Sequence, residues 1–379
     1  MNRSILIVAG EQSGDNYGAA LVHAYSERYG DRSFFGIGGP SMAKEGIDLI
    51  HSMEDLAVTG LVEVVSHLPH IRRIFMKVLA AAKNRRPDAA VLIDSPDFNL
   101  RLARRLHRLG IPVCYYISPT IWAWRRGRIH TLRKYVARML YIFPFEGPIF
   151  EKYDVPAVFV GHPLIERVMA RTGRAEFCQK HGLNPGQPLI AVLPGSRINE
   201  IRHHSPILRE ALSLIQKQNS AQFVVVKAEH LRSEVLKEAF PRDIIPHVLI
   251  EKDGYDALAA ADLALSSCGT ANLEAALLET PVIAFYRLSP LTYRLGKPFV
   301  RVDRYSIVNI LAGKTVIPEL IQDQFTPGNL AAETARILEY SEVRDAMMKE
   351  FRLIRAKLGE SNASENAAAE LHQIVKNVS

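Results

Sequence analysis

Residues 4–15 read SILIVAGEQSGD, a short apolar run that passes directly into a polar turn with two glycines. Such a run is typical of a buried strand, and the amphipathic stretch Asn16–Tyr29 behind it is typical of a helix. Residues 189–197, LIAVLPGSR, repeat this arrangement in the second half of the chain. Two such beginnings predict two α/β units, each a parallel sheet wrapped by helices.

Apolar runs alternate with amphipathic stretches through both halves. The expected strands are Ile5–Ala9, Ser33–Ile37, Ala89–Ile93, Val113–Ile117, Met139–Phe143 and Ala157–Val160, then Pro188–Leu193, Phe223–Val226, His247–Ile250, Leu263–Ser266 and Val282–Phe285. We therefore predict an α/β protein with two Rossmann-like, doubly wound domains, 1–163 and 187–340, facing one another across a cleft. Pro163–Gly186 is the expected linker. The periodicity of 341–379 predicts C-terminal helices that cap the second domain or cross back to the first.

The composition limits the class of protein. The chain has 379 residues, and 47 Lys and Arg against 40 Asp and Glu give a net charge of +7. This balance suits an anionic membrane surface, phosphorylated substrates or nucleic acid, but no nucleic-acid-binding module is present. The three cysteines form neither a disulfide framework nor a zinc motif. With no processing site after the first apolar run and no stretch of about 20 apolar residues, we expect a cytoplasmic protein.

Polar residues directly after the strands are the candidate site, because ligands of open α/β sheets bind beyond the carboxyl ends of the strands. Asp94 follows the apolar run Ala89–Ile93, and Pro96 restricts its backbone. A carboxylate placed there can act as general base toward an alcohol. Asp97 is the alternative base, or the cap of the helix that begins near Asn99.

Two further positions of the first half are candidate anion-binding sites. The turn 10–15 could cradle a phosphate or another anion on the backbone N–H groups of Glu11, Ser13, Gly14 and Asp15. It matches neither a dinucleotide fingerprint nor a Walker motif, and Ser13 or Asp15 could instead be an ordinary helix cap. His162 follows a strand, and its charge could sense phosphate near neutral pH, although a lone histidine is more often structural.

The second half carries a predicted nucleotide site. After Leu189–Leu193, Gly195 permits close approach of the backbone, and Ser196 and Arg197 offer donors to phosphate oxygens. Residues 266–274, SSCGTANLE, place small residues at a helix N-terminus, where Gly269 and Thr270 can meet a diphosphate and Glu274 can hold ribose hydroxyls. The alternative is that the small residues serve helix packing and that Glu274 is solvated.

Residues 61–77, LVEVVSHLPHIRRIFMK, interleave apolar and basic side chains. This pattern suits partial insertion at an anionic membrane surface. The expected contact residues are Leu68, Ile71, Arg72, Arg73, Ile74, Phe75 and Lys77. An ordinary helix with a core-facing side and a basic outer side would show the same periodicity. Two alternatives also remain for Trp122 and Trp124, which could belong to an interfacial surface or to a packed loop.

Seven motifs occur together and in order: AGEQSGD (9–15), IDSPDFN (93–99), YISPTIWAWR (116–125), FPFE (143–146), VGHP (160–163), LPGSR (193–197) and CGTANLE (268–274). From about residue 5 to residue 355 the chain resembles the lipid-A-disaccharide synthase family. The SPxxWAWR block is the most specific of these motifs, whereas GTAxLE is shared with other GT-B enzymes. Gln12 and Cys268 stand where the family usually has alanine and serine, and neither change removes a charge.

The resemblance implies an inverting, metal-independent glycosyltransferase of GT-B fold that needs no cofactor. It would transfer diacylglucosamine from its UDP carrier to the 6-hydroxyl of diacylglucosamine 1-phosphate, giving a β-1′,6 disaccharide and UDP. It also implies that Asp94 is the general base, that Arg197 lies near the diphosphate, that Glu274 binds the ribose and that Asn309 belongs to the donor site. A peripheral location at the cytoplasmic face of the inner membrane and a homodimer are further expectations. The alternatives are an enzyme like UDP-N-acetylglucosamine 2-epimerase, or a non-catalytic UDP-sugar-binding protein.

Overall fold

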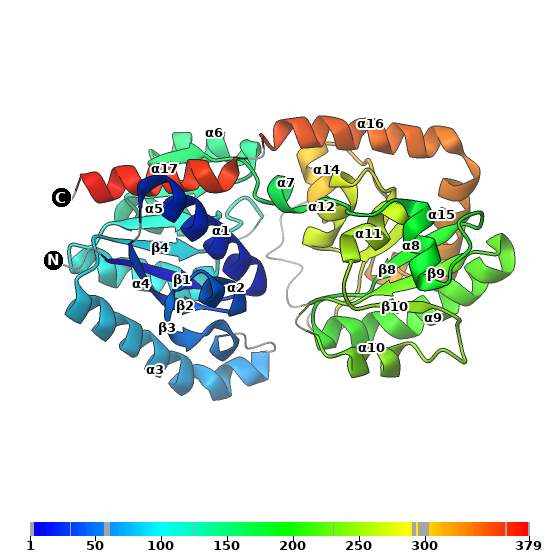
Figure 1. Cartoon of the computed structure of the whole chain (residues 1–379), viewed down its shortest axis with the longest axis horizontal. Coiled ribbons are helices and arrows are strands. Elements are labelled where there is room, and N and C mark those ends of the chain that lie inside the picture. The colour runs from blue at the N-terminus through cyan, green and yellow to red at the C-terminus, as the bar shows by residue number, and fades with distance from the viewer. Residues whose placement is uncertain are drawn as a thin grey trace. The chain divides into compact units, whose positions relative to one another are not determined.

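The computed structural model describes residues 4–30, 32–56, 61–123, 125–229, 231–289, 293–294, 303–360 and 362–377, with the backbone alone for 61–67. The chain divides into two compact units. Unit 1 comprises Met1–Pro163 and Leu358–Ser379, and unit 2 comprises Leu164–Lys357. Each unit is built on its own parallel sheet (Figure 1).

Unit 1 contains a seven-stranded sheet of order β3-β2-β1-β4-β5-β6-β7. Its strands are β1 (Ser4–Ala9), β2 (Ser33–Gly38), β3 (Asp48–Ser52), β4 (Ala89–Ile93), β5 (Val113–Tyr116), β6 (Arg138–Tyr141) and β7 (Ala157–Phe159). The strands β1 and β4 pair in parallel from Ile5 opposite Ala89 to Ala9 opposite Ile93. The strand order reverses at this pair, so the crevice where such sheets bind ligands lies beyond Ala9 and Ile93.

Helices cover both faces of the sheet of unit 1. They are α1 (Gln12–Tyr29), α2 (Pro40–Lys44), α3 (Leu61–Arg85), α4 (Pro96–Arg108), α5 (Arg128–Tyr135), α6 (Gly147–Lys152) and α17 (Ala363–Lys376), with 3-10 turns η1 (Met53–Asp55) and η2 (Pro144–Glu146). One core joins α1 and α17 to the sheet through residues such as Tyr25 and Leu371. The other joins α3, α4 and α5 through Ile74, Leu102 and Leu132.

The last helix of the chain belongs to unit 1, where it lies against α1 (Figure 1). The ring of His372 stacks on Tyr29 with centroids 3.8 Å apart, and the amide of Asn366 donates to the carbonyl of Val160 over 3.1 Å. The preceding helix α16 (Ser341–Lys357) belongs to unit 2. The helical segment expected at 341–379 is therefore divided between the two units.

Unit 2 contains a six-stranded sheet of order β10-β9-β8-β11-β12-β13. Its strands are β8 (Leu189–Leu193), β9 (Gln222–Val226), β10 (Val248–Ile250), β11 (Leu263–Ser267), β12 (Val282–Tyr286) and β13 (Glu319–Ile321). The helices described in it are α7 (Leu164–Arg167), α8 (Arg174–His181), α9 (Ile198–Asn219), α10 (Ser233–Ala239), α11 (Gly254–Ala260), α12 (Thr270–Leu277), α14 (Ile307–Ala312), α15 (Pro327–Glu339) and α16, with the 3-10 turn η4 (Gln322–Gln324). Two parallel sheets with helices confirm the predicted α/β class.

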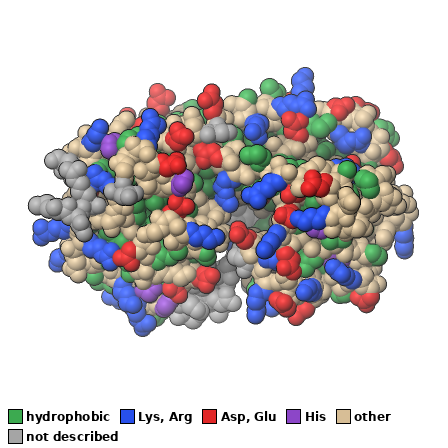
Figure 2. Space-filling view, in the orientation of Figure 1, with side chains coloured by type: hydrophobic (Ala, Val, Ile, Leu, Met, Phe, Trp, Pro, Cys, Tyr) green, Lys and Arg blue, Asp and Glu red, His purple; other side chains and the backbone are tan. Residues whose placement is uncertain are grey.

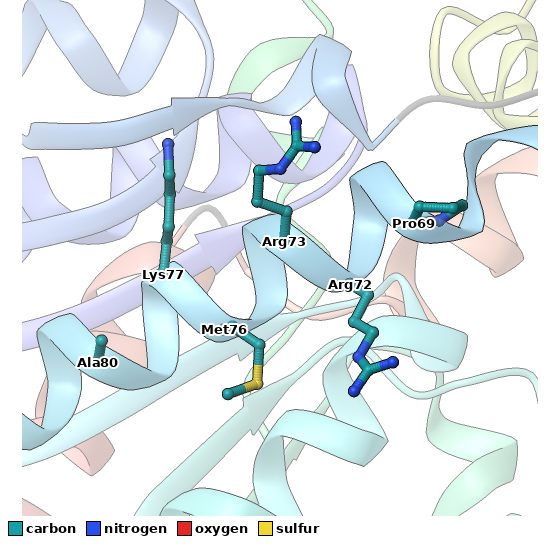
Figure 3. Close-up of a pocket in the computed structure, with 6 residues that line it drawn as sticks. All are labelled: Pro69, Arg72, Arg73, Met76, Lys77 and Ala80. Atoms are coloured by element: carbon teal, nitrogen blue, oxygen red, sulfur yellow. The ribbon is translucent and has the colours of Figure 1, made fainter.

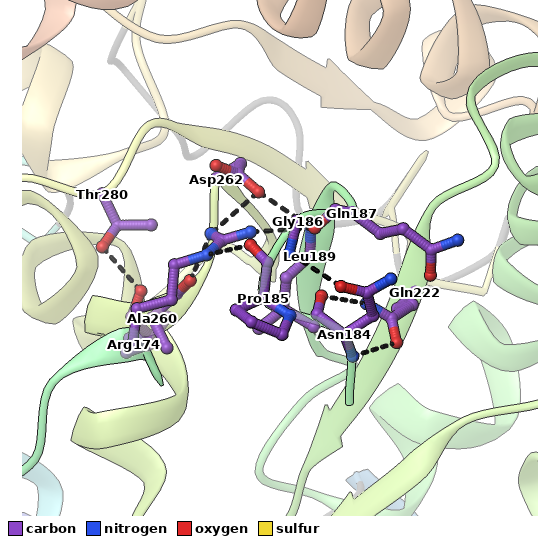
Figure 4. Close-up of polar contacts among 11 residues, drawn as sticks. Arg174, Asn184, Pro185, Gly186, Gln187, Leu189, Gln222, Ala260, Asp262 and Thr280 are labelled. Carbon is purple, nitrogen blue, oxygen red and sulfur yellow. Dashed lines mark hydrogen bonds and ion pairs between the residues drawn. The ribbon is translucent and has the colours of Figure 1, made fainter. Parts of the chain in front are cut away.

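Residues 164–186 were expected to form part of a linker, but they belong to unit 2. The guanidinium of Arg174 donates to the carbonyl of Ala260 over 2.7 Å and to the carboxylate of Asp262 over 2.9 Å (Figure 4). The same Asp262 carboxylate accepts the N–H of Leu189, the first residue of β8. A segment tied in this way to the beginning of the sheet is a packed element, and the expectation of a linker over its whole length is wrong.

Candidate active site

Asp94 lies at the switch point of unit 1, and its backbone is fixed by three hydrogen bonds. Its N–H donates to the carbonyl of Tyr116, and its own carbonyl accepts from the Tyr115 hydroxyl over 2.6 Å and the Asn99 amide over 2.9 Å. Asp94 and Ser95 both have positive φ, 45° and 42°. Side chains avoid this conformation unless the surroundings impose it, and such strain gathers at functional sites. The structure thus holds the backbone of Asp94 in one conformation.

The electrostatics of this carboxyl suit a proton acceptor. The pKa of Asp94 is raised to about 7, chiefly by burial and also by the nearby Glu11 carboxylate, while the Ser95 N–H and the Arg128 guanidinium act in the opposite direction. A general base is most effective when its pKa lies near the working pH. Asp94 therefore changes charge near neutral pH.

Asp97 has a different environment. Its carboxylate is exposed and accepts from the guanidinium groups of Arg125 and Arg128 over 2.7 and 2.8 Å. It lies in the first turn of α4, but no side-chain cap is formed at that helix end. Its oxygen is thus engaged in ion pairs, which makes it a weaker candidate for the base than Asp94.

Asp15 and Gly14, predicted to belong to a phosphate loop, serve packing in the structure. The Asp15 carboxylate is fully buried and accepts the N–H groups of Gly39, Ser41 and Met42 over 2.6, 2.9 and 3.1 Å. A Cβ on Gly14 would approach the Cβ of Ala9 to 3.3 Å, so the glycine lets α1 lie close to β1. The side chain of Asp15 thus holds a neighbouring turn in place, and the binding of an anion by the backbone of this loop stays a prediction.

Glu11 and Ser13 stay at the accessible side of the same turn. Glu11 is exposed and Ser13 is partly buried. A Cβ on Gly10 would lie 2.4 Å from the hydroxyl oxygen of Ser95, so this turn touches the strained turn at Asp94. Glu11 and Asp94 accordingly face the same crevice, although they belong to different strand ends.

His162 is buried, with 2% of its surface exposed, and its ring packs beside Phe143 with centroids 5.1 Å apart. Burial lowers the pKa of His162 to about 3. The ring is therefore neutral near neutral pH, and the prediction that its charge senses phosphate is wrong. Its backbone N–H donates to the carbonyl of Leu358, which holds the last segment of the chain on unit 1.

In unit 2, the turn after β8 is held by a carboxylate that sequence reasoning missed. Glu200 accepts the N–H groups of Ser196 and Arg197 over 3.0 and 3.3 Å. The guanidinium of Arg197 lies 3.6 Å from the same carboxylate and is half exposed. The spacing of Arg197 and Glu200, from N-cap to third helical residue, is that of a capping box and could have revealed this contact.

His204 also holds this turn in place, and sequence reasoning missed it as well. It is fully buried; its Nδ1 lies 2.7 Å from the Pro194 carbonyl, and its Nε2 accepts the N–H of Arg287 over 3.1 Å. These partners require a proton on Nδ1 and none on Nε2. Burial lowers the pKa of His204, which agrees with a neutral ring. The histidine thus ties the β8 turn to the chain that follows β12.

The turn after β11 presents the other predicted nucleotide residues. Gly269 and Thr270 are exposed at the N-terminal end of α12. Glu274, one turn on, is partly buried and accepts from the hydroxyl of Tyr255 over 3.2 Å. Burial raises the pKa of Glu274, and Tyr255 and Arg167 lower it. The alternative of a solvated Glu274 does not hold.

Asn309 is fully buried, and all four hydrogen-bonding positions of its amide are used within unit 2. The amide nitrogen donates to the Ile317 carbonyl and the Glu319 carboxylate over 2.9 and 2.8 Å. The oxygen accepts from the N–H groups of Val316 and Ile317 over 2.7 and 3.0 Å. Asn309 therefore organises the chain around β13, and its place in the donor site stays a prediction.

The helix α3 separates the predicted membrane-contact residues into two groups. Ile74 is 1% exposed within the core, so its prediction as a membrane contact is wrong. Phe75 is partly buried and packs edge-on against Phe98 at 5.5 Å, and its contact with a membrane stays a prediction. Leu68 and Met76 are 48% and 55% exposed. Ile71 is partly buried; the side chains of 61–67, and Trp124, lie outside the described residues.

The outer side of α3 is basic and partly apolar, and a surface pocket on it is lined by Pro69, Arg72, Arg73, Met76, Lys77 and Ala80. Arg73 and Lys77 project to one side of the helix, and Arg72 and Met76 to the other (Figure 3). Lys and Arg side chains gather along this edge of unit 1 (Figure 2). We call Leu68, Arg72, Arg73, Met76 and Lys77 the α3 outer face.

The described residues contain neither a membrane-spanning helix nor a cluster typical of a metal site. None of the helices they form is long and apolar enough to cross a bilayer. In the same residues, no cluster of three or more His, Cys, Asp or Glu is arranged as a metal site.

Two parallel sheets, each with its polar turns at the carboxyl ends of the strands, define the class of GT-B proteins. Among solved structures, UDP-GlcNAc 2-epimerase from Neisseria meningitidis is similar with a TM-score of 0.65 and 15% identity, covering 98% of this chain and 100% of that one. CalG4, the calicheamicin glycosyltransferase, is similar with a TM-score of 0.62 and 17% identity, covering both chains fully. At such identities these likenesses show the fold alone.

The sequence comparisons identify the family. The family described as lipid-A-disaccharide synthetase matches residues 5–375. The lipid-A-disaccharide synthase of Solibacter usitatus is 41% identical over 373 residues, covering 98% of this chain and 97% of the relative. That of Syntrophus aciditrophicus is 42% identical over 377 residues, covering 99% and 98%. The chain belongs to the lipid-A-disaccharide synthetase family, and its activity is the glycosyl transfer that forms the lipid A disaccharide, not epimerisation.

Proposed function

We propose that the chain transfers 2,3-diacylglucosamine from UDP-2,3-diacylglucosamine to the 6-hydroxyl of 2,3-diacylglucosamine 1-phosphate, with Asp94 as general base. The observation that carries this assignment is the strained, fixed position of Asp94 at the switch point, with a pKa near 7. The hydroxyl of a sugar is a poor nucleophile unless a base within hydrogen-bonding reach takes its proton. Asp94 has the place and the proton affinity for this task.

The reaction is a single displacement. The 6-oxygen of the acceptor forms a bond to C1 of the donor sugar, and its proton passes to the Asp94 carboxylate. The bond between C1 and the diphosphate oxygen breaks, and UDP leaves with the electron pair. Attack from the side opposite the leaving group inverts C1 and gives the β-1′,6 linkage.

Unit 2 supplies the groups that stabilise the leaving UDP. Arg197 is half exposed beside the turn of Ser196, and Gly269 and Thr270 open α12. Positive charge and helix N-termini favour the negative charge that develops on a leaving diphosphate. Glu274, oriented by Tyr255, is placed to accept ribose hydroxyls. Asn309 supports this site indirectly, through the segment that it holds.

The α3 outer face is the proposed contact with the cytoplasmic surface of the inner membrane. It combines exposed Leu68 and Met76 with Arg72, Arg73 and Lys77. Each basic residue near an anionic leaflet contributes about 1 kcal/mol, and an inserted apolar side chain adds a similar amount. Because both substrates carry acyl chains, a protein resting on the membrane meets them where they reside.

A direct test uses the purified protein with UDP-diacylglucosamine and an acylated glucosamine 1-phosphate, and follows disaccharide formation by mass spectrometry. Wild-type protein should form the disaccharide, and Asp94→Asn should lower turnover by about 10²- to 10⁴-fold. Asp97→Asn is the matched variant from the same loop. Near-normal turnover of a folded Asp94→Asn protein, together with loss in Asp97→Asn, would move the role of base to Asp97.

A further inference from the structure

A second carboxyl group lies at the carboxyl ends of the strands of unit 1, and it is more deeply buried than Asp94. Glu146 ends the 3-10 turn η2 after β6 and is 1% exposed. Neither of its carboxyl oxygens has a hydrogen-bond partner of ordinary geometry. Burial raises the pKa of Glu146 to about 7, and Ser118, the Phe143 backbone and Trp122 lower it in part. This group has no place in the chemistry assigned to Asp94.

Two other buried polar groups face the Glu146 carboxyl, and neither has a hydrogen-bond partner of ordinary geometry. The hydroxyl of Ser118, a residue 5% exposed, and the indole N–H of Trp122 belong to the loop after β5. Buried polar groups of native proteins are nearly always hydrogen-bonded, to the protein or to an ordered water. Three unsatisfied side chains that converge on one point therefore indicate a place for a small polar ligand.

The position of this cluster connects it with the proposed acceptor side. The strands β4, β5 and β6 are neighbours, with Ile93 opposite Tyr116 and Tyr116 opposite Leu140. Asp94, Ser118 and Glu146 accordingly follow three consecutive strands of one sheet edge. The loop that carries Ser118 is strained, because Ile117 has φ 70° although β-branched side chains disfavour that conformation.

Aromatic rings surround the cluster and remain partly exposed. The ring of Trp122 meets Phe145 edge-on at 5.3 Å, and Phe145 stacks on Phe143 at 5.6 Å. All three rings are partly accessible, whereas the polar atoms lie beneath them. A few convergent polar groups under an apolar rim are the usual construction of a small-molecule subsite.

We propose that Glu146, Ser118 and Trp122 form a subsite for one hydroxyl group, which is water in the resting protein and a hydroxyl of the acceptor sugar during turnover. The inference rests on the proposed function, and it makes Glu146 a residue that determines acceptor specificity. The indole donates to the hydroxyl oxygen, the carboxyl accepts the hydroxyl proton, and Ser118 can do either. An acceptor acylated at positions 2 and 3 retains hydroxyls at 4 and 6, and since the 6-hydroxyl reacts, the subsite fits the 4-hydroxyl.

The test measures steady-state kinetics with the acylated glucosamine 1-phosphate and with its 4-deoxy analogue, at fixed UDP-diacylglucosamine. Glu146→Gln keeps the shape of the side chain, and Trp122→Phe removes the N–H but keeps the ring. We expect each to raise the acceptor KM by roughly 5- to 100-fold and to leave the donor KM unchanged. Glu151→Gln, an exposed glutamate of α6, is the control that should change neither.

The deoxy analogue separates the two sources of the hydroxyl. The analogue should raise the acceptor KM of the wild-type protein by the same factor as Glu146→Gln raises it for the natural acceptor. Glu146→Gln assayed with the analogue should show no further rise. Additive losses would show that the site holds water alone, and would overturn the assignment to the acceptor. Unchanged acceptor KM values in Trp122→Phe, which should fold even if Glu146→Gln does not, would overturn the subsite. Absence of disaccharide with wild-type protein would instead contradict the proposed function.

Discussion

The pH dependence of turnover offers the sharpest test of Asp94. With a pKa of about 7, Asp94 is about half ionised at pH 7, about a tenth at pH 6 and about nine tenths at pH 8. The value of kcat/KM should therefore fall about tenfold per pH unit below the pKa. In the Glu146→Gln background, which removes the other carboxyl with a pKa of about 7, the Asp94→Asn protein should show a low, flat profile over the same range. The measurement is the rate of disaccharide formation at limiting acceptor in buffers of constant ionic strength.

A second variant tests the cause of the raised pKa. The Glu11 carboxylate raises the pKa of Asp94, so Glu11→Gln should lower that pKa and move the fall in kcat/KM to lower pH. The informative quantity is the position of the fall along the pH axis, since Glu11 can also affect acceptor binding. A fall that keeps its position in Glu11→Gln, or that persists in Asp94→Asn, would refute the assignment of the titrating group.

The same shift has a consequence for stability. In the unfolded chain the pKa of Asp94 is the usual 3.8, and in the folded protein it is about 7, so the free energy of unfolding falls as pH rises from about 4 to about 7, and the full loss persists above pH 7. The difference corresponds to at most about 4 kcal/mol, and to roughly 1–3 kcal/mol after solvent screening. Asp94→Asn should raise the melting temperature at pH 8 and leave it nearly unchanged at pH 4. A lower melting temperature at pH 8 would contradict this electrostatic account.

Three further outcomes test the other parts of the site. Arg197→Ala should weaken UDP binding by about 1.5–3 kcal/mol in calorimetry, and EDTA should leave wild-type activity unchanged; loss restored by a divalent cation would contradict metal independence. Asn309→Ala should lower the free energy of unfolding by about 2–4 kcal/mol, since it leaves four partners unpaired, and should weaken UDP binding as a consequence. Leu68→Ser with Met76→Ser should release the protein from anionic vesicles without a change in melting temperature, whereas Ile74→Ser should destabilise it by about 2–5 kcal/mol; continued sedimentation of the first variant would place the contact elsewhere.

The sheets were largely predictable because strands of a parallel sheet are buried on both faces and appear as continuous apolar runs. All five residues of Ala89–Ile93 are buried, for example. The two strands that were not predicted lie at sheet edges. The strand β3, DLIHS, mixes polar and apolar residues, and none of its side chains is fully buried. The strand β13 has only three residues. Neither shows the pattern that marks a central strand.

The site was predictable to the extent that the ends of strands mark it. This rule placed Asp94 and Arg197, but it could not tell which polar side chains of a turn point inward. Asp15 turns inward because its partners are backbone groups of residues 39–42, and Asn309 because its partners are residues 316–319. Such partners come from other segments of the chain, so no local pattern reveals them. Ile74 illustrates the same limit, since the periodicity of α3 leaves open which side meets the core.

The polar residues of the motifs therefore perform two kinds of task. Asp15, Glu200 and His204 hold backbone turns in place, whereas the proposed function assigns to Asp94 and Arg197 the groups that act on the substrates. Stabilising a developing charge requires groups that are already oriented, and side chains that fix the turns provide that orientation. The two tasks predict opposite effects of mutation. Replacing a turn-holding residue should lower stability and activity together, since its buried partners lose their hydrogen bonds. Replacing Asp94 should lower activity and raise stability above about pH 7, because a strained, desolvated carboxylate favours the reaction at the expense of the fold.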